Sequence, residues 1–462
     1  MQAGNVMVEV IEGARLPVLS WAPDLEDGAR LQALNCADLP VAFHHVAVMA
    51  DGHQGYGVPI GGVLALTGSI APYAVGNDIG CGMKLVATTV SRADLLGRLP
   101  TRSGAEGPVA RDDIMGWVQT AVPAGSATHP RGVADDRADT LVGRAFDAME
   151  EAAAACGVPL STSQAERPRR EQALSRDEMI RRGRTHLGTL GAGNHFLELL
   201  AAPDGCVSML VHSGSRGVGG LIASNFHRMA LAHCRAAGCP LADPGLAWLP
   251  HPSGDGATAE PWPTVGACYE HAMRAALEYA ENNRRRMLER VAEIVERRFP
   301  DTVMWDTAVD VHHNDASFEH HYGRDVWVHR KGAVKAGAGM TTITPGSMGA
   351  GTVVGRGLGN PASFESCAHG AGRELSRTRA RDQLDLQEEL ATIEAAGGKV
   401  YVSNKAAVLD EMPAAYKNLD EVMANQADLV EARVVLRPIG TYKGSEASRR
   451  SRRGRWRPAE ER

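Results

Sequence analysis

Residues 41–66 read VAFHHVAVMADGHQGYGVPIGGVLAL, and the pattern of this stretch is the basis for predicting the fold. Two apolar runs, Val41–Ala50 and Val58–Leu66, flank the glycine-rich segment Asp51–Gly57. Short apolar runs bounded by turn residues are typical of buried strands, and glycines between them are typical of tight connections. The segment Gly76–Gly82, which an apolar run follows, repeats the arrangement. The sequence therefore predicts strands joined by glycine-rich loops.

Helical periodicity appears farther along the chain, interleaved with more strands. Apolar residues recur with helical spacing at about 138–156, 171–184, 219–237, 265–299 and 382–396. Strands are expected at 195–200, 207–212 and 399–403, and short strands with loops across 305–370. The regular alternation of a Rossmann or TIM chain is missing, and no repeat period is evident. We therefore predict an α+β fold in which residues 1–444 form one large intertwined domain.

Three segments are expected to lie outside the core of this domain. Residues 95–140 and 240–262 are rich in loop-forming residues and are predicted to be peripheral inserts. Residues 445–462 hold seven arginines and no apolar periodicity. Such a charge run is more typical of a disordered end than of a specific binding element.

The composition excludes several classes of protein. The 462 residues are 44% hydrophobic and 23% charged, as in ordinary globular proteins. The formal net charge is −6, so a nucleic-acid site must be a local patch, and aromatic residues, at 5%, are too scarce for long stacking platforms. Eight cysteines lie scattered without CxxC pairs, and neither a signal peptide nor a membrane span is evident. A cytoplasmic protein without membrane contact is expected, and a monomer is the default.

Five clusters place His, Asp or Cys beside glycines. They are DGHQGYG at 51–57, GNDIGCG at 76–82, GAGNHFLE at 191–198, HSGSRG at 212–217, and HHN at 312–314 followed by HGAGR at 369–373. Any one of these residues has a bland explanation, because a lone His is usually structural, a lone Cys a buried small hydrophobe and a lone Asp a turn cap. Their recurrence at strand–glycine junctions favours a shared site instead.

The residue types in these clusters indicate a two-ion metal site. A carboxylate, a thiolate and three imidazoles give about the ligand count that two ions need. This mixture suits manganese, cobalt, iron or zinc, whereas magnesium prefers oxygen ligands. Asp78 and Cys81 lie three residues apart, and a polarizable thiolate can bridge two ions. Backbone N–H groups of neighbouring glycine loops would suit a phosphate.

In their order along the chain, these strings resemble the RtcB family of RNA ligases. The resemblance runs from about Ala50 to Gly444 through MADGHQGYGVPIGG, VGNDIGCGM, GTLGAGNHFLEL, HSGSRG, HHN, VHRKGA, TPGSMG, CAHGAGRELSR and PIGTYKG. It implies an enzyme of tRNA splicing or RNA repair that uses GTP and manganese. Such an enzyme joins RNA 3′-phosphate or 2′,3′-cyclic phosphate ends to 5′-hydroxyl ends. The implied intermediates are a covalent histidine–GMP and RNA(3′)pp(5′)G, and some relatives use an archease activator.

The resemblance also assigns roles to matching residues. Asp78 and His195 would bind the first manganese ion, His212 and His313 the second, and Cys81 both. His313 is chosen over His312 because the family's ligand directly precedes an asparagine. His369 resembles the nucleophile that takes GMP from GTP. Guanylate contacts are implied for Asn194, His195, Glu198, His313, Asn314, Pro345, Gly346, Ser347, Met348, Thr352 (where the family pattern leads us to expect serine), His369, Gly370, Ala371, Gly372 and Lys443.

Two other functions stay open at this point. A binuclear phosphoesterase that hydrolyses cyclic phosphates without guanylylation would need the metal residues but neither His369 nor Lys443. An RNA-binding or translation-associated factor with an inactive metal site would be expected to lack ligands, whereas all five are present. The ligase is the function that the motifs favour.

Overall fold

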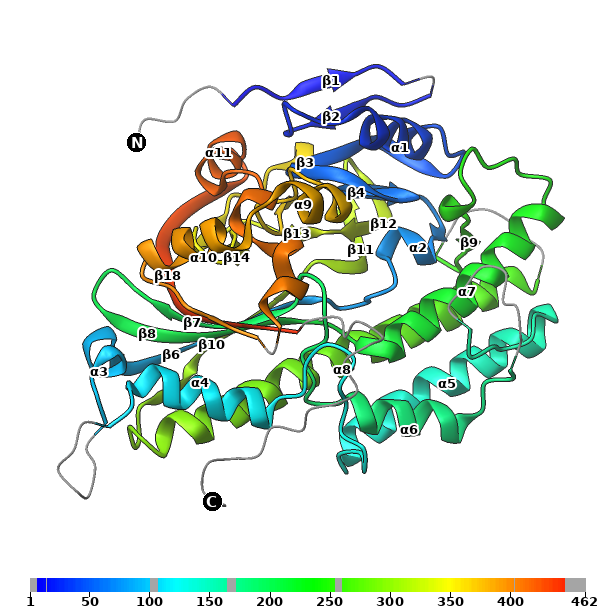
Figure 1. Cartoon of the computed structure of the whole chain (residues 1–462). Helices are drawn as coiled ribbons and strands as arrows, with labels where there is room; N and C mark the ends of the chain where they lie inside the picture. Colours follow the sequence, from blue (N-terminus) through cyan, green and yellow to red (C-terminus); the bar gives the residue numbers. More distant parts are fainter. Residues whose placement is uncertain are drawn as a thin grey trace.

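The computed structural model describes residues 6–13, 15–99, 107–163, 172–253, 260–402 and 404–444. These residues form two large sheets with helices packed mainly below one of them, as Figure 1 shows. Strands and helices from distant parts of the chain interleave in one body. The predicted α+β class and the single intertwined domain are confirmed. The arginine-rich residues 445–462 lie outside the described residues.

The first sheet contains most of residues 41–66, in which the sequence predicted two strands. Its six strands, in spatial order, are β1 (Glu9–Ile11), β2 (Val18–Ser20), β3 (Ala42–Tyr56), β4 (Val58–Leu66), β12 (Arg324–Lys331) and β11 (Asn314–His321). Helix α1 (Asp27–Ala37) packs on β3 and β4. The connection between the two strands is shorter than the predicted segment Asp51–Gly57. Strand β3 continues through residues 51–56 with shifts in its register, and only Gly57, at φ 68°, makes the turn. These irregularities carry Asp51 and His53 beyond the regular part of the sheet.

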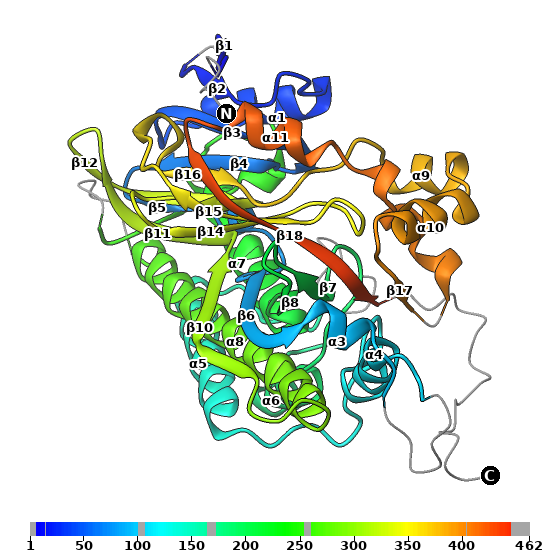
Figure 2. The same ribbon diagram turned by 90° about the vertical axis from the view of Figure 1, so that its left-hand side faces the viewer.

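The second sheet is curled and joins early, middle and late parts of the chain. In spatial order its strands are β10 (Val303–His312), β6 (Gly82–Ser91), β8 (Cys206–Ser213), β7 (Phe196–Ala201), β18 (Val430–Lys443), β15 (Thr352–Gly357) and β14 (Thr341–Pro345), with β17 (Val400–Tyr401) beside β18. One end of β18 pairs with β15 and the other with β7, and Figure 2 shows this strand crossing the molecule. The strands predicted near 195–200 and 207–212 are confirmed as β7 and β8.

Four long helices pack together beneath this sheet. They are α5 (Asp136–Cys156), α6 (Arg176–His186), α7 (Arg216–Ala236) and α8 (Trp262–Glu296). Helix α5 begins where the Asp135 carboxylate accepts a hydrogen bond from the Ala138 N–H, and it ends at Gly157 in a left-handed conformation. Large side chains such as Tyr269 and Tyr279 are fully buried between the helices. No helix among the described residues is both long enough and apolar enough to cross a membrane.

Both segments predicted as peripheral inserts contribute to the core instead. Within 95–140, α4 (Ala110–Ala121) buries Ile114, Met115 and Val118 in one hydrophobic cluster with residues of α8 and β18. Within 240–262, Leu246 to Leu249 are buried, and β9 (Leu249–Pro250) pairs with β5 (Ser69–Ile70). Loop-forming residues flank both short apolar runs, so their composition conceals the buried positions.

The remaining elements connect the sheets and cover the end of the site. Short connecting elements are α2 (Pro72–Val75), α3 (Arg92–Leu96), the 3-10 helices η1 (Pro244–Leu246) and η2 (Pro361–Ser363), and the strand pair β13 (Ala333–Lys335) and β16 (Ser366–Ala368). The covering segment comprises α9 (Arg377–Gln383), α10 (Leu386–Ala395), η3 (Lys405–Glu411), η4 (Pro413–Ala415) and α11 (Leu419–Asn425). A small core that includes Met348, Ile393 and Met412 attaches this segment to the second sheet.

Candidate active site

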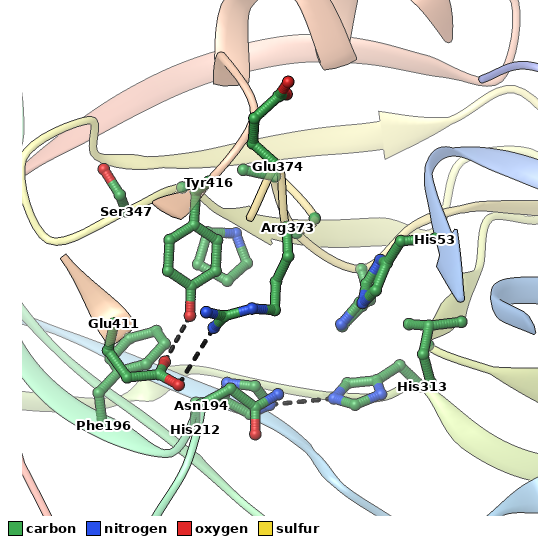
Figure 3. Close-up of a pocket in the computed structure, with 18 of the residues that line it drawn as sticks. His53, Asn194, Phe196, His212, His313, Ser347, Arg373, Glu374, Glu411 and Tyr416 are labelled. Carbon is green, nitrogen blue, oxygen red and sulfur yellow. Dashed lines mark hydrogen bonds and ion pairs between the residues drawn. The ribbon is translucent and has the colours of Figure 1, made fainter. Parts of the chain in front are cut away.

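A cavity of about 600 Å³ collects strand ends from both sheets. His53 and Ile60 reach it from the first sheet, while Phe196, His212 and Lys443 reach it from the second. Figure 3 shows His53, His212, His313, Arg373 and Tyr416 pointing into this common space, whereas Glu374 points away from it. Because the loops between strands supply the other walls, residues far apart in sequence meet here.

Two groups of metal-ligating atoms share one thiol at the base of the cavity. In the first group, His195 Nε2 lies 2.9 Å from Asp78 Oδ2 and 3.3 Å from Cys81 Sγ. In the second, His212 Nε2 lies 3.3 Å from the same Sγ and 3.0 Å from His313 Nε2. Cys81 therefore stands between two three-residue groups, which is the arrangement that a bridging thiolate requires.

The local sequence explains why Asp78 and Cys81 meet these histidines. The two residues lie in the loop between α2 and β6, which turns at Gly80 with φ 71°. Backbone hydrogen bonds from Gly80 N to Asn314 O, at 2.8 Å, and from His313 N to Cys81 O, at 2.9 Å, join this loop to the β10–β11 connection.

Gly214, in the HSGSRG string, is needed for a different reason. A Cβ atom at this position would lie 2.2 Å from Asp78 Oδ1. Any side chain there would push the carboxylate away from His195, so the glycine permits the close approach of the two loops.

The hydrogen bonds of the histidines direct their lone pairs to the centre of each group. His195 Nδ1 lies 2.9 Å from the Leu190 carbonyl, which only accepts, so Nδ1 carries the proton and Nε2 is free to ligate. Burial lowers the pKa of both His212 and His313, which keeps these rings neutral. Their Nε2 atoms lie 3.0 Å apart, so one ring donates to the other here, and a metal ion would take the place of that proton.

The donor set fits a pair of divalent transition-metal ions. Burial raises the pKa of the Cys81 thiol, and Asp78 raises it further, so a thiolate here needs a cation beside it. Although burial opposes ionisation, the hydrogen bond and charge of His195 keep the pKa of Asp78 below its ordinary value. Asp78 Oδ1 is buried without a hydrogen-bond partner and is available as a further ligand atom.

His369 lies beside this centre and contacts a buried carboxylate. Its Nδ1 is 2.6 Å from Asp51 Oδ2, and its ring centre is 4.6 Å from that of His313. The Gly370 N–H donates to the same Asp51 oxygen at 3.2 Å. Asp51 faces the Nδ1 side of the ring, so the Nε2 atom is the one left for chemistry. The sequence singled out the DGH string but did not pair Asp51 with His369.

The other end of the cavity is built around a second buried carboxylate, Glu411. Lys443 Nζ lies 2.9 Å from Glu411 Oε2, the Tyr416 hydroxyl donates to the same oxygen, and Arg377 and Arg373 lie 2.9 and 3.3 Å from Oε1. Figure 3 shows Arg373, Tyr416 and Glu411 converging. Although burial opposes ionisation, Lys443 and Arg377 lower the pKa of Glu411 to about 2. Sequence reasoning missed Glu411 and Tyr416, which lie in none of the quoted strings.

Glu198, one of the predicted guanylate contacts, has a different environment. Burial raises its pKa to about 7, and the Thr441 hydroxyl donates to its Oε1 at 2.7 Å. Thr441 and Lys443 come from the PIGTYKG string at the end of β18, which pairs with β7. The register of these two strands therefore places Glu198 and Lys443 on the same wall.

The structure brings nearly all of the predicted residues to this one cavity. The lining includes Asp78, Cys81, Asn194, Glu198, His212, His313, Asn314, Pro345, Gly346, Ser347, Met348, His369, Gly370, Ala371, Gly372 and Lys443. His195 lies behind Asp78 and Cys81 and does not line the cavity itself, and Thr352 is fully buried in β15 outside the lining. The side chain of His312 is 44% exposed beside Asp315, whereas His313 faces the centre.

Fold and site together define a protein with a candidate two-ion centre next to a carboxylate-held histidine. Comparisons with known proteins then give the family. A family model described as tRNA-splicing ligase RtcB matches residues 32–444. The chain is 35% identical over 447 residues to the RNA-splicing ligase RtcB of Escherichia coli (strain K12), an alignment that covers 94% of this chain and 99% of the relative.

More distant relatives agree. Identity is 33% over 462 residues to the RNA-splicing ligase RtcB of Mycobacterium tuberculosis, covering 90% of this chain and 100% of the relative. It is 30% over 493 residues to the tRNA-splicing ligase RtcB of Aeropyrum pernix, covering 93% and 95%. The chain belongs to the RtcB family.

Proposed function

We propose that this protein is a GTP- and manganese-dependent RNA ligase. It would join RNA 3′-phosphate or 2′,3′-cyclic phosphate ends to 5′-hydroxyl ends, in tRNA splicing or RNA repair. The observation that carries the proposal is the 2.6 Å contact between His369 and Asp51, next to two ligand groups that share Cys81. Family membership supports the same conclusion, and an archease-like activator remains an expected partner.

The residues divide the work of the first step among them. Asp78 and His195 would hold one manganese ion, His212 and His313 the other, and Cys81 both; the pair would neutralise charge on phosphoryl oxygens. His369 Nε2 would attack the α-phosphorus of GTP, forming an N–P bond as pyrophosphate leaves. Asp51 would fix the ring so that the lone pair is on Nε2. Asn194, Glu198, Ser347 and Lys443 would orient the guanylate.

The later steps follow from the chemistry of the phosphoramidate. Its nitrogen leaves readily once protonated, so GMP can pass to an RNA 3′-phosphate and give RNA(3′)pp(5′)G. The 5′-hydroxyl of the second RNA end then attacks the 3′-phosphorus, an O–P bond forms, and GMP is expelled. A cyclic phosphate end would first be opened by water to a 3′-phosphate.

Incubation with α-labelled GTP and manganese, followed by a denaturing gel, tests this function. We expect a labelled protein band that is labile in acid and stable in alkali, as a phosphoramidate would be. His369→Ala should bind metal but lose the band. The exposed His320, whose ring contacts only the exposed Asp325, gives the matched control His320→Ala, which should keep it.

Two outcomes would contradict the proposal. Label on the His369→Ala variant would show that another residue is the nucleophile. A wild-type protein that holds two metal ions, takes no label and hydrolyses cyclic phosphates would instead be a phosphoesterase.

A further inference from the structure

His53 lines the cavity but has no part in the proposed function so far. It lies in β3, in the DGHQGYG string, and belongs to neither metal-ligating group. Its Nδ1 is 2.9 Å from the carbonyl oxygen of Asp51. A carbonyl can only accept, so Nδ1 carries the proton and the lone pair is on Nε2. The backbone of Asp51 thus fixes the His53 tautomer, while its carboxylate holds His369.

His53 lies away from the expected guanylate contacts Glu198 and Lys443, although it is near His369 and His313. Figure 3 shows Phe196, Glu411 and Tyr416 on one side of the cavity and His53 on the other, above His313. The expected guanylate contacts Glu198 and Lys443 lie in β7 and β18. Phe196, on the first side, also lies in β7 and pairs with Lys443. Gln54, Gly55 and Ile60, which line the cavity beside His53, are not among the expected guanylate contacts. The RNA end would lie on this side, where it can meet the guanylate at His369.

Burial keeps the His53 ring neutral although the charged Asp51 lies nearby. Burial lowers its pKa below the ordinary value; the hydrogen bond to Asp51 and the Asp51 charge oppose this, whereas His369 and Lys417 add to it. Lys417, in the covering segment, donates to the Gly52 carbonyl, and Glu26, the residue directly before α1, accepts from the Gln54 N–H. A neutral imidazole with a free Nε2 accepts protons and does not donate them from that atom.

Several of the other lining groups are already engaged, and Glu198 is an expected guanylate contact. The Nε2 atoms of His212 and His313 belong to the second metal-ligating group. The Asp51 carboxylate contacts His369 and Gly370. Glu411 is saturated by Lys443, Tyr416 and the arginines.

We propose that His53 is the general base of the sealing step and takes the proton of the RNA 5′-hydroxyl. The inference rests on the proposed ligase function. As the 5′-oxygen forms its bond to the 3′-phosphorus, its proton passes to His53 Nε2. The bond from that phosphorus to the GMP oxygen breaks, and GMP leaves with the electron pair. Protons and charges balance without a further reactant.

Separating the steps tests the assignment in the full-length protein. We would measure labelling by GTP, the amount of RNA(3′)pp(5′)G and the rate of joined RNA for the wild type, His53→Gln, His53→Asn and the surface control His320→Gln. Asn keeps an N–H close to the Nδ1 position, whereas Gln places an amide near Nε2, and neither is a useful base. Both variants should still be labelled, accumulate RNA(3′)pp(5′)G and seal about 10²–10⁴-fold more slowly. The control should match the wild type.

The pH dependence distinguishes a base from a structural residue. Because the pKa of His53 is lowered, wild-type sealing should not change above about pH 6.5, the ordinary histidine value. Without the base the reaction depends on hydroxide, so the His53→Gln rate should rise about tenfold per pH unit. Added imidazole should restore sealing to His53→Ala, and more basic imidazoles should restore it more.

Each contrary result would have a defined meaning. Wild-type sealing in both variants would overturn the proposal. Equal losses of labelling and sealing, parallel at every pH and not rescued by imidazole, would show that His53 is structural. If the wild type is neither labelled nor able to join RNA, the ligase function itself fails and the inference fails with it.

Discussion

At the scale of single residues, the candidate site depends on which nitrogen of each histidine is free. Carbonyl oxygens of Leu190 and Asp51 fix the Nδ1 protons of His195 and His53, at 2.9 Å in both cases. His369 differs, because a carboxylate oxygen lies 2.6 Å from its Nδ1 and would stabilise a positive ring if the proposed phosphoramidate forms and breaks. The different partners of the three histidines suit the three different roles proposed for them.

The clearest single-residue test of this view is Asp51→Asn. An amide can donate to Nδ1 and leave the proton on Nε2, which would block the nucleophile. We expect adduct formation from GTP to slow by about 10²–10⁴-fold, while two metal ions per chain remain. Rapid-quench labelling and metal analysis measure the two quantities. The exposed pair His320 and Asp325, 2.8 Å apart, supplies the control Asp325→Asn, and loss of metal from Asp51→Asn would refute a purely orienting role.

How much of the site was predictable also differs from residue to residue. The glycine-flanked strings contain the five candidate ligands and His369; their residue types indicated a metal site, whereas the role of each residue was implied by the resemblance to the RtcB family. The partner of His369 was not visible, since Asp51 meets it only through the packing of β3 against β16. Glu411 and Tyr416 lie in a covering segment without glycine strings, so nothing in the sequence connected them with Lys443.

At the scale of elements, α8 shows why a charge run is a weak predictor. A run of arginines such as 284–286 is usually a solvated face, yet Arg284 is 1% exposed. It donates to the carbonyls of Gly80 and Ser213, at 2.6 and 2.9 Å, and pairs with Asp310 at 2.5 Å. Consecutive helical residues point about 100° apart, so one arginine of the run faces the sheet while its neighbours do not. Arg284 thereby joins α8 to the loops that hold Asp78 and His212.

Removing this arginine should therefore destabilise the protein. Arg284→Met removes the main partner of Asp310, whose side chain is 14% exposed, and the donor to the buried Gly80 and Ser213 carbonyls; we expect a loss of about 3 kcal/mol in the free energy of unfolding. Urea denaturation measures it. Arg290 on the same helix, with its side chain 51% exposed and paired to Glu293, gives the control Arg290→Met, which should cost less than about 1 kcal/mol. Equal effects of the two substitutions would mean that Arg284 is not a structural tie.

Element boundaries were predictable where capping and turn residues mark them. The helix predicted at 382–396 is interrupted, because Asp385 accepts from Gln387 N and Glu388 N and so begins α10 after α9 has ended. Helix α4 was missed for the opposite reason. Its buried face consists of only a few residues between glycine- and proline-rich flanks, so its periodicity is short.

At the scale of the whole molecule, the site exists because two sheets meet. Strand β3 of the first sheet supplies Asp51 and His53, while β18 of the second ends at Lys443. The sequence indicated strands and loops at both places, but the pairing of β18 with both β7 and β15 depends on long-range register, which no local pattern encodes. That pairing brings a late segment of the chain to residues placed near its beginning.

Charge is also distributed unevenly over the whole chain, and this leads to a last prediction. Residues 445–462, which follow directly after Lys443 and Gly444, carry seven arginines and three glutamates, so without them the formal net charge changes from −6 to −10. RNA is a polyanion, and each phosphate contact that is lost lowers the salt dependence of single-strand binding by about 0.7 in log–log slope. Truncation after Gly444 should keep labelling by GTP but weaken RNA binding, most strongly at low salt.

Titrations of labelled RNA at several salt concentrations would measure this effect. A full-length variant with the seven arginines changed to lysine should bind nearly as the wild type does, because phosphate attraction depends on charge more than on side-chain shape. The same arginines changed to glutamine should behave like the truncated protein. Loss of labelling on truncation would show that the segment supports the site itself, and an unchanged salt slope would place the RNA contacts entirely on residues before 445.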